Sequence, residues 1–209
     1  MDMDPRPRLI AFGLLTFVSV ISAWYRTRAN RMGGRIKHPA FTGGRVWLLI
    51  PLRLLLVVFI VSCFIDPLWM HWAHMGLPES ARWAGIGVAA IGGVLMWWMF
   101  HHLGLNVTPV AYPRADATLV TTGPYRFIRH PLYLFATICL LGIGTAIDSG
   151  AFIVFPLGAC MIMAIRVPHE EALLVEKFGD AYRKYQTRTG RFLPRLQRWH
   201  DDMNPTLSI

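Results

Sequence analysis

Residues 121–133 read TTGPYRFIRHPLY and lie between two long apolar runs. Arg129 and His130 directly precede the apolar run that begins at Leu132, and a second charged cluster, RVPHEE at 166–171, follows the next apolar run. An antiparallel helical hairpin formed by these two runs would bring both clusters to one membrane face. Ionisable side chains at the edge of the hydrocarbon are costly to desolvate, so the two clusters mark a candidate functional site.

The composition indicates a membrane protein. Of the 209 residues, 54% are hydrophobic and only 16% are charged, and a soluble domain of this size could not bury that apolar share. The net charge of +9 does not indicate a nucleic-acid partner, because the basic residues are concentrated in loops that flank apolar runs, where charge sets topology. Cys63, Cys139 and Cys160 all lie inside apolar runs, which indicates packing rather than a disulfide or a thiolate metal site.

The apolar runs predict an all-α, polytopic membrane protein formed by a single domain over residues 1–209, with about five transmembrane helices. A helix needs roughly 17–20 apolar residues to cross a bilayer. We place the spans at 9–24, 46–65, 81–100, 132–147 and 151–165. The last two are separated only by Asp148, Ser149 and Gly150, so they are expected to form a tight antiparallel hairpin.

The loops between these spans differ in charge and predict an orientation. The loop at 25–45 contains several Lys and Arg residues and no acid, whereas 66–80 contains Asp66 and Glu79 and no Lys or Arg. Because Lys and Arg are enriched in cytoplasmic loops, the N-terminus is expected outside. The loop 101–131 and the tail 166–209 are then expected in the cytosol, together with both charged clusters.

The tail predicts an amphipathic helix on the cytosolic side. From 169 to about 187, apolar and aromatic residues recur at steps of three and four, with Gly179 as a modest interruption and Pro168 complicating continuity with the preceding span. Arg166 and Glu170 are four residues apart and would share one helix face. They form either an ordinary salt bridge or a grip for a zwitterion, whose ammonium and carboxylate they complement.

Two stretches of this sequence resemble a known family. GPYRFIRHPLY, followed by a short hairpin and then by HEEALLVEKFGDAYRKYQTRTGRFLP, is similar to the C-terminal signature of the isoprenylcysteine carboxyl methyltransferases. Phospholipid N-methyltransferases look like more distant relatives. The resemblance covers residues 103–194, whereas the first three spans, within 1–100, match only in being hydrophobic.

This resemblance implies an integral membrane enzyme that uses S-adenosylmethionine. It places residues 101–194 around the cofactor and 1–100 on the side of the methyl acceptor. The implied adenosine side consists of Leu119, Val120 and Gly123. The implied amino-acid end consists of His130, Tyr133, Arg166 and Glu170, supported by Tyr125 and Glu171.

The resemblance also implies a role for Arg129, which matches the position expected to orient an anionic acceptor and is therefore the catalytic candidate. Tyr182 and Tyr185 either contact the cofactor or only pack, as aromatic residues at helical spacing commonly do. The acceptor is expected to be lipophilic: a prenylcysteine, a lipid or another small hydrophobic molecule. A sulfonium methyl group is already activated, so transfer is chiefly a matter of positioning.

Several alternatives remain at this point. His71 with His74, and His101 with His102, lack the further ligands that a metal site needs, so no metal is expected. Arg53, inside the second predicted span, either snorkels to the interface or lines the acceptor's route. A nicotinamide-dependent membrane reductase or a non-catalytic scaffold would share much of this pattern, and binding of S-adenosylmethionine or of reduced nicotinamide separates them.

Overall fold

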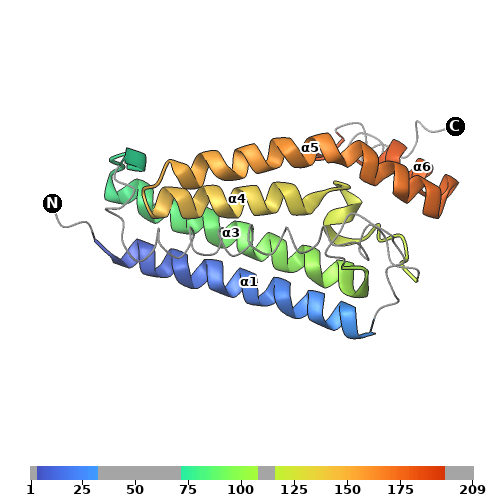
Figure 1. Ribbon diagram of the computed structural model, residues 1–209, viewed down its shortest axis with the longest axis horizontal. Helices are drawn as coiled ribbons and strands as arrows, with labels where there is room; N and C mark the ends of the chain where they lie inside the picture. The colour runs from blue at the N-terminus through green and yellow to red at the C-terminus, as the bar shows by residue number, and fades with distance from the viewer. Residues whose placement is uncertain (1–3, 33–71, 108–115, 196–209) are drawn as a thin grey trace, which may run out of the picture.

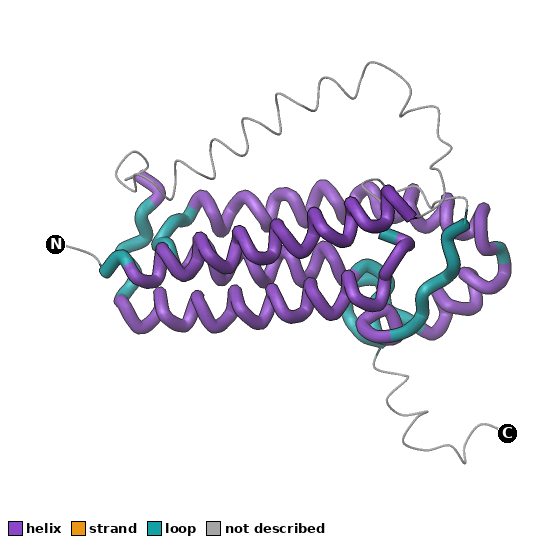
Figure 2. The backbone as a smooth tube through the Cα atoms, turned by 90° about the horizontal axis from the view of Figure 1, so that it is seen from below, coloured by secondary structure: helices purple, strands orange, loops and turns teal. Residues whose placement is uncertain are grey.

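The computed structural model describes residues 4–32, 72–107 and 116–195. In these ranges the regular elements are all helical: α1 (Arg6–Met32), α3 (Glu79–Leu103), α4 (Pro131–Ala146), α5 (Ala151–Phe178) and α6 (Asp180–Arg188). Two short 3-10 turns, η3 (Gly104–Asn106) and η4 (Gly123–Arg126), lie between α3 and α4. The four long helices form an elongated bundle, and α6 projects beyond one end of it (Figure 1, Figure 2).

Three of these helices, α1, α3 and α5, are long and apolar enough to cross a membrane, whereas α4 is a shorter apolar helix. The predicted spans 9–24, 81–100 and 151–165 fall inside α1, α3 and α5, and 132–147 corresponds to α4. The predicted span 46–65, with Arg53, lies outside the described residues. In the described ranges the predicted helical fold is therefore confirmed, with three helices able to cross a membrane, and the number of five spans stays a prediction.

Helices α3 and α4 pack with their backbones in contact. A Cβ atom added to Gly85 would lie 2.7 Å from the backbone nitrogen of Ala146, and one added to Gly142 would collide with the backbone of Ala89. Gly92 faces Cys139 in the same way, and Cys139 is buried. Small residues allow this close approach where lipid provides no hydrophobic drive between helices, so Cys139 has the packing role predicted for it.

The predicted hairpin of α4 and α5 is confirmed, and its turn is tightly held. Asp148 has a left-handed backbone with φ of 55° and is 1% exposed. Its carboxylate accepts a hydrogen bond from the backbone N–H of Leu77 at 3.1 Å and lies 3.4 Å from Nδ1 of His74. The backbone N–H of Gly150 donates to the carbonyl of Ala73 at 2.7 Å. These bonds close the end of the bundle opposite α6.

The prediction for the tail needs a correction. A single amphipathic helix over 169–187 is wrong, because α5 runs from the hairpin through Pro168 to Phe178 and α6 is a separate helix. Pro168 lies on the exposed side of α5, where water or side chains can satisfy the backbone carbonyl that loses its partner. Gly179 ends α5 with φ of 58°, a left-handed conformation that glycine adopts without steric cost.

Candidate functional site

Arg129, His130 and Pro131, which we call the RHP motif, lie at the start of α4 and pair with residues near the end of the described chain. Pro131 begins α4, where its missing N–H costs nothing. The backbone N–H groups of Arg129 and His130 donate to the carbonyls of Gly190 and Arg191 at 2.8 and 3.1 Å, and that of Gly190 donates to the carbonyl of Phe127. We call residues 189–192 the strap, because they cross the motif in extended pairing.

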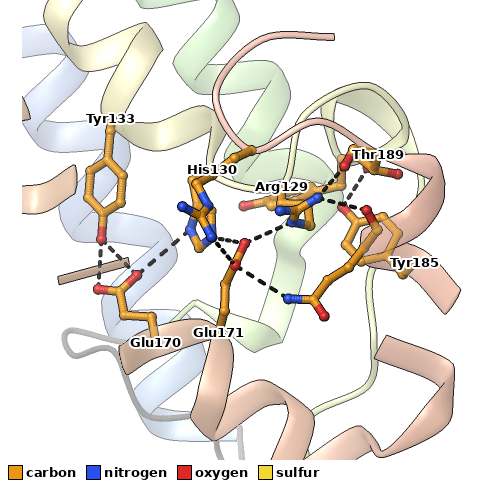
Figure 3. A network of polar contacts seen from close by, with 10 residues as sticks. Arg129, His130, Tyr133, Glu170, Glu171, Tyr185 and Thr189 are labelled. Carbon is orange, nitrogen blue, oxygen red and sulfur yellow. Dashed lines mark hydrogen bonds and ion pairs between the residues drawn. The ribbon is translucent and has the colours of Figure 1, made fainter. Parts of the chain in front are cut away.

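Glu171 is the centre of a buried polar network (Figure 3). Its side chain is 6% exposed. Nε of Arg129 and Nη2 of Arg191 each donate to it at 2.8 Å, and Nε2 of Gln186 donates at 3.3 Å. Nε2 of His130 also lies 3.3 Å from it. One carboxylate with two guanidinium partners is charge-compensated, and it joins α5 to both the motif and the strap.

Arg129 itself is buried with a side chain 7% exposed. Besides its bond to Glu171, Nη1 donates to the carbonyl oxygens of Gln186 and Thr189, which lie at the end of α6 and the start of the strap. The guanidinium is thus turned toward the protein's own acceptors. The structure gives Arg129 a role in holding Glu171 and the strap, in addition to the acceptor-orienting role that stays a prediction.

Glu170 has a different environment from its neighbour. The hydroxyl of Tyr133 donates to both of its carboxylate oxygens, at 2.8 and 2.9 Å, and Nδ1 of His130 lies 3.7 Å from one of them. Arg166 is exposed and makes no hydrogen bond or ion pair with Glu170 in the described part of the chain, so the ordinary salt bridge considered from the sequence is absent. Within that part, no guanidinium is hydrogen-bonded or ion-paired to Glu170, and Arg166 acts on it only through longer-range electrostatics.

His130 is held in its neutral form. Burial lowers its pKa from the ordinary value, and the positive charges of Arg129 and Arg191 lower it further, while Glu171 opposes the shift. The loss of hydration of a charged imidazole therefore outweighs its attraction to the carboxylate. A neutral imidazole has a single N–H, and an ionised carboxylate only accepts hydrogen bonds, so His130 can donate to only one of the two glutamates. Glu171, at 3.3 Å, is within hydrogen-bond distance, whereas Glu170, at 3.7 Å, is not.

Three aromatic rings lie together beside these carboxylates. His130 and Tyr133 have ring centroids 6.0 Å apart with an interplanar angle of 12°. Phe192, from the strap, lies 6.0 Å from His130 and 6.4 Å from Tyr133. The strap therefore contributes a side chain as well as backbone hydrogen bonds.

The segment before the motif is fixed by the end of α3 and by η3. Asn106 accepts a hydrogen bond from the backbone N–H of Thr118 at 3.0 Å and donates to its hydroxyl at 3.2 Å. Gly123, with φ of 59°, packs so closely on the ring of His102 that a Cβ there would collide with it. These contacts hold 118–123, which contains Leu119 and Val120, at both ends.

The structure thus brings together five of the predicted residues, Arg129, His130, Tyr133, Glu170 and Glu171. Tyr125 lies at the edge of the site, where its carbonyl accepts a hydrogen bond from the hydroxyl of Tyr185 at 2.6 Å. Burial raises the pKa of its own phenol. Leu119, Val120 and Gly123 form a separate segment, and Arg166 lies on the exposed side of α5.

Sequence reasoning missed Arg191, Gln186 and Phe192. Their signal was present, since QTRTGRFLP at 186–194 belongs to the stretch that carried the family resemblance. The mixture of Arg with apolar residues after Gly190 is equally typical of a segment anchored at a membrane interface. Tyr182 and Tyr185 are both buried against each other, so they have at least the packing role.

Within the described ranges, groups of three or more His, Cys, Asp or Glu side chains able to hold a metal ion are absent. His74 is bound to Asp148, and Nδ1 of His102 lies 3.0 Å from the carbonyl of Trp98. His71 lies outside the described residues.

Comparisons with known proteins point to one family. Residues 80–181 match the family model described as phospholipid methyltransferase. The cobalt-zinc-cadmium resistance protein CzcN of Cupriavidus metallidurans is 29% identical over 60% of this chain and 53% of its own. The protein-S-isoprenylcysteine O-methyltransferase of Schizosaccharomyces pombe is 37% identical over 38% of this chain and 34% of its own. Methanethiol S-methyltransferase of Pseudomonas deceptionensis is 34% identical over 40% and 31%, respectively.

Alignment with these relatives is partial, because the matched region spans about half or less of their length. A solved structure of the eukaryotic intramembrane Ras methyltransferase, isoprenylcysteine carboxyl methyltransferase, is also similar. Its TM-score is 0.49 at 24% identity, with 74% of this chain and 55% of that chain covered.

Proposed function

We propose that this chain is a member of the phospholipid methyltransferase family, close to the isoprenylcysteine methyltransferases, and that it transfers a methyl group from S-adenosylmethionine to a lipophilic acceptor in a membrane. The amino-acid end of this cofactor carries an ammonium and a carboxylate. Its sulfonium supplies an activated methyl group when it is bound.

The observation that carries the proposal is the difference between two adjacent carboxylates. Glu171 is compensated by Arg129 and Arg191, whereas Glu170 receives hydrogen bonds from the Tyr133 phenol and lies near the neutral ring of His130. A partly buried carboxylate without a guanidinium partner favours a ligand cation. Arg166, one helical turn earlier on the same helix, is the proposed partner of the ligand's carboxylate.

The residues of the site match what methyl transfer requires. An ionised or lone-pair acceptor needs no strong general base when the methyl group is activated, only short-range, in-line approach. The hydroxyl of Tyr133 fixes the orientation of Glu170, and the buried network around Glu171 fixes α5 relative to the motif. These residues therefore position reactants rather than shuttle protons.

The acceptor is proposed to arrive from the bilayer. The part of α5 that precedes Arg166 presents large apolar side chains outward, among them Met161 at 71% and Ile165 at 79% exposure, as a lipid-facing helix does. A prenylcysteine, a lipid or a small hydrophobic thiol each fits this route. The relatives named for isoprenylcysteine and for methanethiol support the breadth of this choice.

Binding measurements on the full, detergent-purified chain test the proposal. S-adenosylmethionine should bind, and reduced nicotinamide dinucleotide should not. Binding of the nicotinamide alone would favour a reductase, and binding of neither would favour a scaffold.

A substitution tests the carrying observation. Glu170→Ala should weaken S-adenosylmethionine binding by about 1.5–3 kcal/mol, the scale of a hydrogen bond to a charged group, as measured by isothermal titration. Glu176→Ala, an exposed glutamate later on α5, is the matched control and should leave binding unchanged. Equal affinity in both variants would reduce Glu170 to a structural residue.

A further inference from the structure

We infer that Phe192, delivered by the strap, is a binding residue of the site that recognises the positive charge of the cofactor's sulfonium group. This inference rests on the proposed function and adds a residue that the resemblance did not assign. It begins from the three-ring cluster, in which Phe192 lies within 6.4 Å of both Tyr133 and His130.

The strap holds Phe192 in place through the two residues before it. The carbonyls of Gly190 and Arg191 accept the backbone N–H groups of Arg129 and His130, and the guanidinium of Arg191 binds Glu171. This ion pair joins the half-exposed guanidinium of Arg191 to the buried carboxylate of Glu171. The position of Phe192 is therefore set by bonds to the motif itself.

The charges around the ring favour a cation there. Glu170 is the carboxylate without a guanidinium partner in the described residues, and the Tyr133 that hydrogen-bonds it contacts Phe192. Aromatic faces attract cations through their quadrupole, and the effect grows when water is excluded. An alkylated cation such as a sulfonium cannot donate a hydrogen bond, so an aromatic wall is a natural partner for it.

The test compares two ligands that differ in this charge. S-adenosylmethionine carries the sulfonium, whereas S-adenosylhomocysteine has a neutral thioether and the same adenosine and amino-acid ends. Phe192→Leu in the full chain keeps apolar bulk and removes the π face. Isothermal titration should show S-adenosylmethionine affinity falling by about 5-fold to 10-fold, with S-adenosylhomocysteine affinity changing by less than about 2-fold.

Two further variants sharpen the result. Phe192→Tyr keeps the ring face and should restore affinity for S-adenosylmethionine. Leu193 directly follows the strap and is 71% exposed. Leu193→Ala is therefore the control and should alter neither affinity. Because both ligands are measured on one preparation, a misfolded fraction lowers the stoichiometry for both and cannot change the ratio of their affinities.

The outcomes separate the inference from the proposed function. An unchanged ratio in Phe192→Leu, whether both affinities fall together or neither falls, overturns the sulfonium role and leaves the proposed function intact. Failure of the unsubstituted protein to bind either ligand overturns the proposed function and takes the inference with it.

Discussion

At the scale of single residues, the buried imidazole of His130 predicts a dependence of stability on pH. Its pKa is lowered by burial and by Arg129 and Arg191, against the pull of Glu171, with Glu170 also facing the ring. The unfolded chain therefore binds a proton at a higher pH than the folded chain does. Stability is complete above the unfolded pKa of about 6.5 and falls below it, by at most about 1.4 kcal/mol per pH unit. Thermal unfolding in detergent between about pH 7.5 and 5 should show this loss, and His130→Gln should reduce it; an equal slope in the variant would assign the effect to other histidines.

Single residues were also where sequence reasoning reached furthest and then stopped. His130, Tyr133 and Glu170 were expected at one site, and the structure brings them together. The difference between Glu170 and Glu171 could not be predicted, since adjacent glutamates on a helix point to different sides and only the packed structure shows which side meets Arg129 and Arg191.

At the scale of elements, the hydrogen bonds between η3 and Thr118 lead to a prediction for 118–123, the segment that the resemblance implies on the adenosine side. Asn106 binds Thr118 through two hydrogen bonds. Asn106→Ala should therefore weaken binding of 5′-methylthioadenosine, which lacks the amino-acid end, and of S-adenosylhomocysteine by the same factor. We expect about 5-fold to 30-fold, because each hydrogen bond contributes about 1 kcal/mol. Glu170→Ala should weaken only the second ligand. Titration of both ligands against both variants checks this, and an Asn106→Ala effect confined to S-adenosylhomocysteine would contradict it.

The helices themselves were largely predictable, because apolar runs and the turn at Asp148 to Gly150 leave few alternatives. The continuity of α5 through Pro168 was not. A proline lowers the expectation of helix by a local argument, whereas tertiary bonds from Glu170 and Glu171 stabilise the turn that follows it.

At the scale of the whole molecule, the loop charges predict an orientation that an accessibility experiment can check. A tag at the N-terminus should be reached from outside the cytoplasm and a tag after Ile209 from within, because 25–45 is rich in Lys and Arg and free of acids. Protease protection in sealed vesicles distinguishes the sides. Tags on the same side would mean that an even number of helices cross.

The glycine contacts between α3 and α4 have a mechanical consequence. Because their backbones touch along Gly85, Gly92 and Gly142, we expect the two helices to move as one rigid unit. This unit carries His130 at the start of α4 and Asn106, which binds Thr118, just after the end of α3. Helix α5 is joined to this unit by hydrogen bonds at the Asp148 turn and, at the other end, through Glu171. Helix α5 is therefore held at both of its ends, by the hairpin turn and near the two glutamates. The strap adds to the bonds at this second end through the ion pair of Arg191 with Glu171.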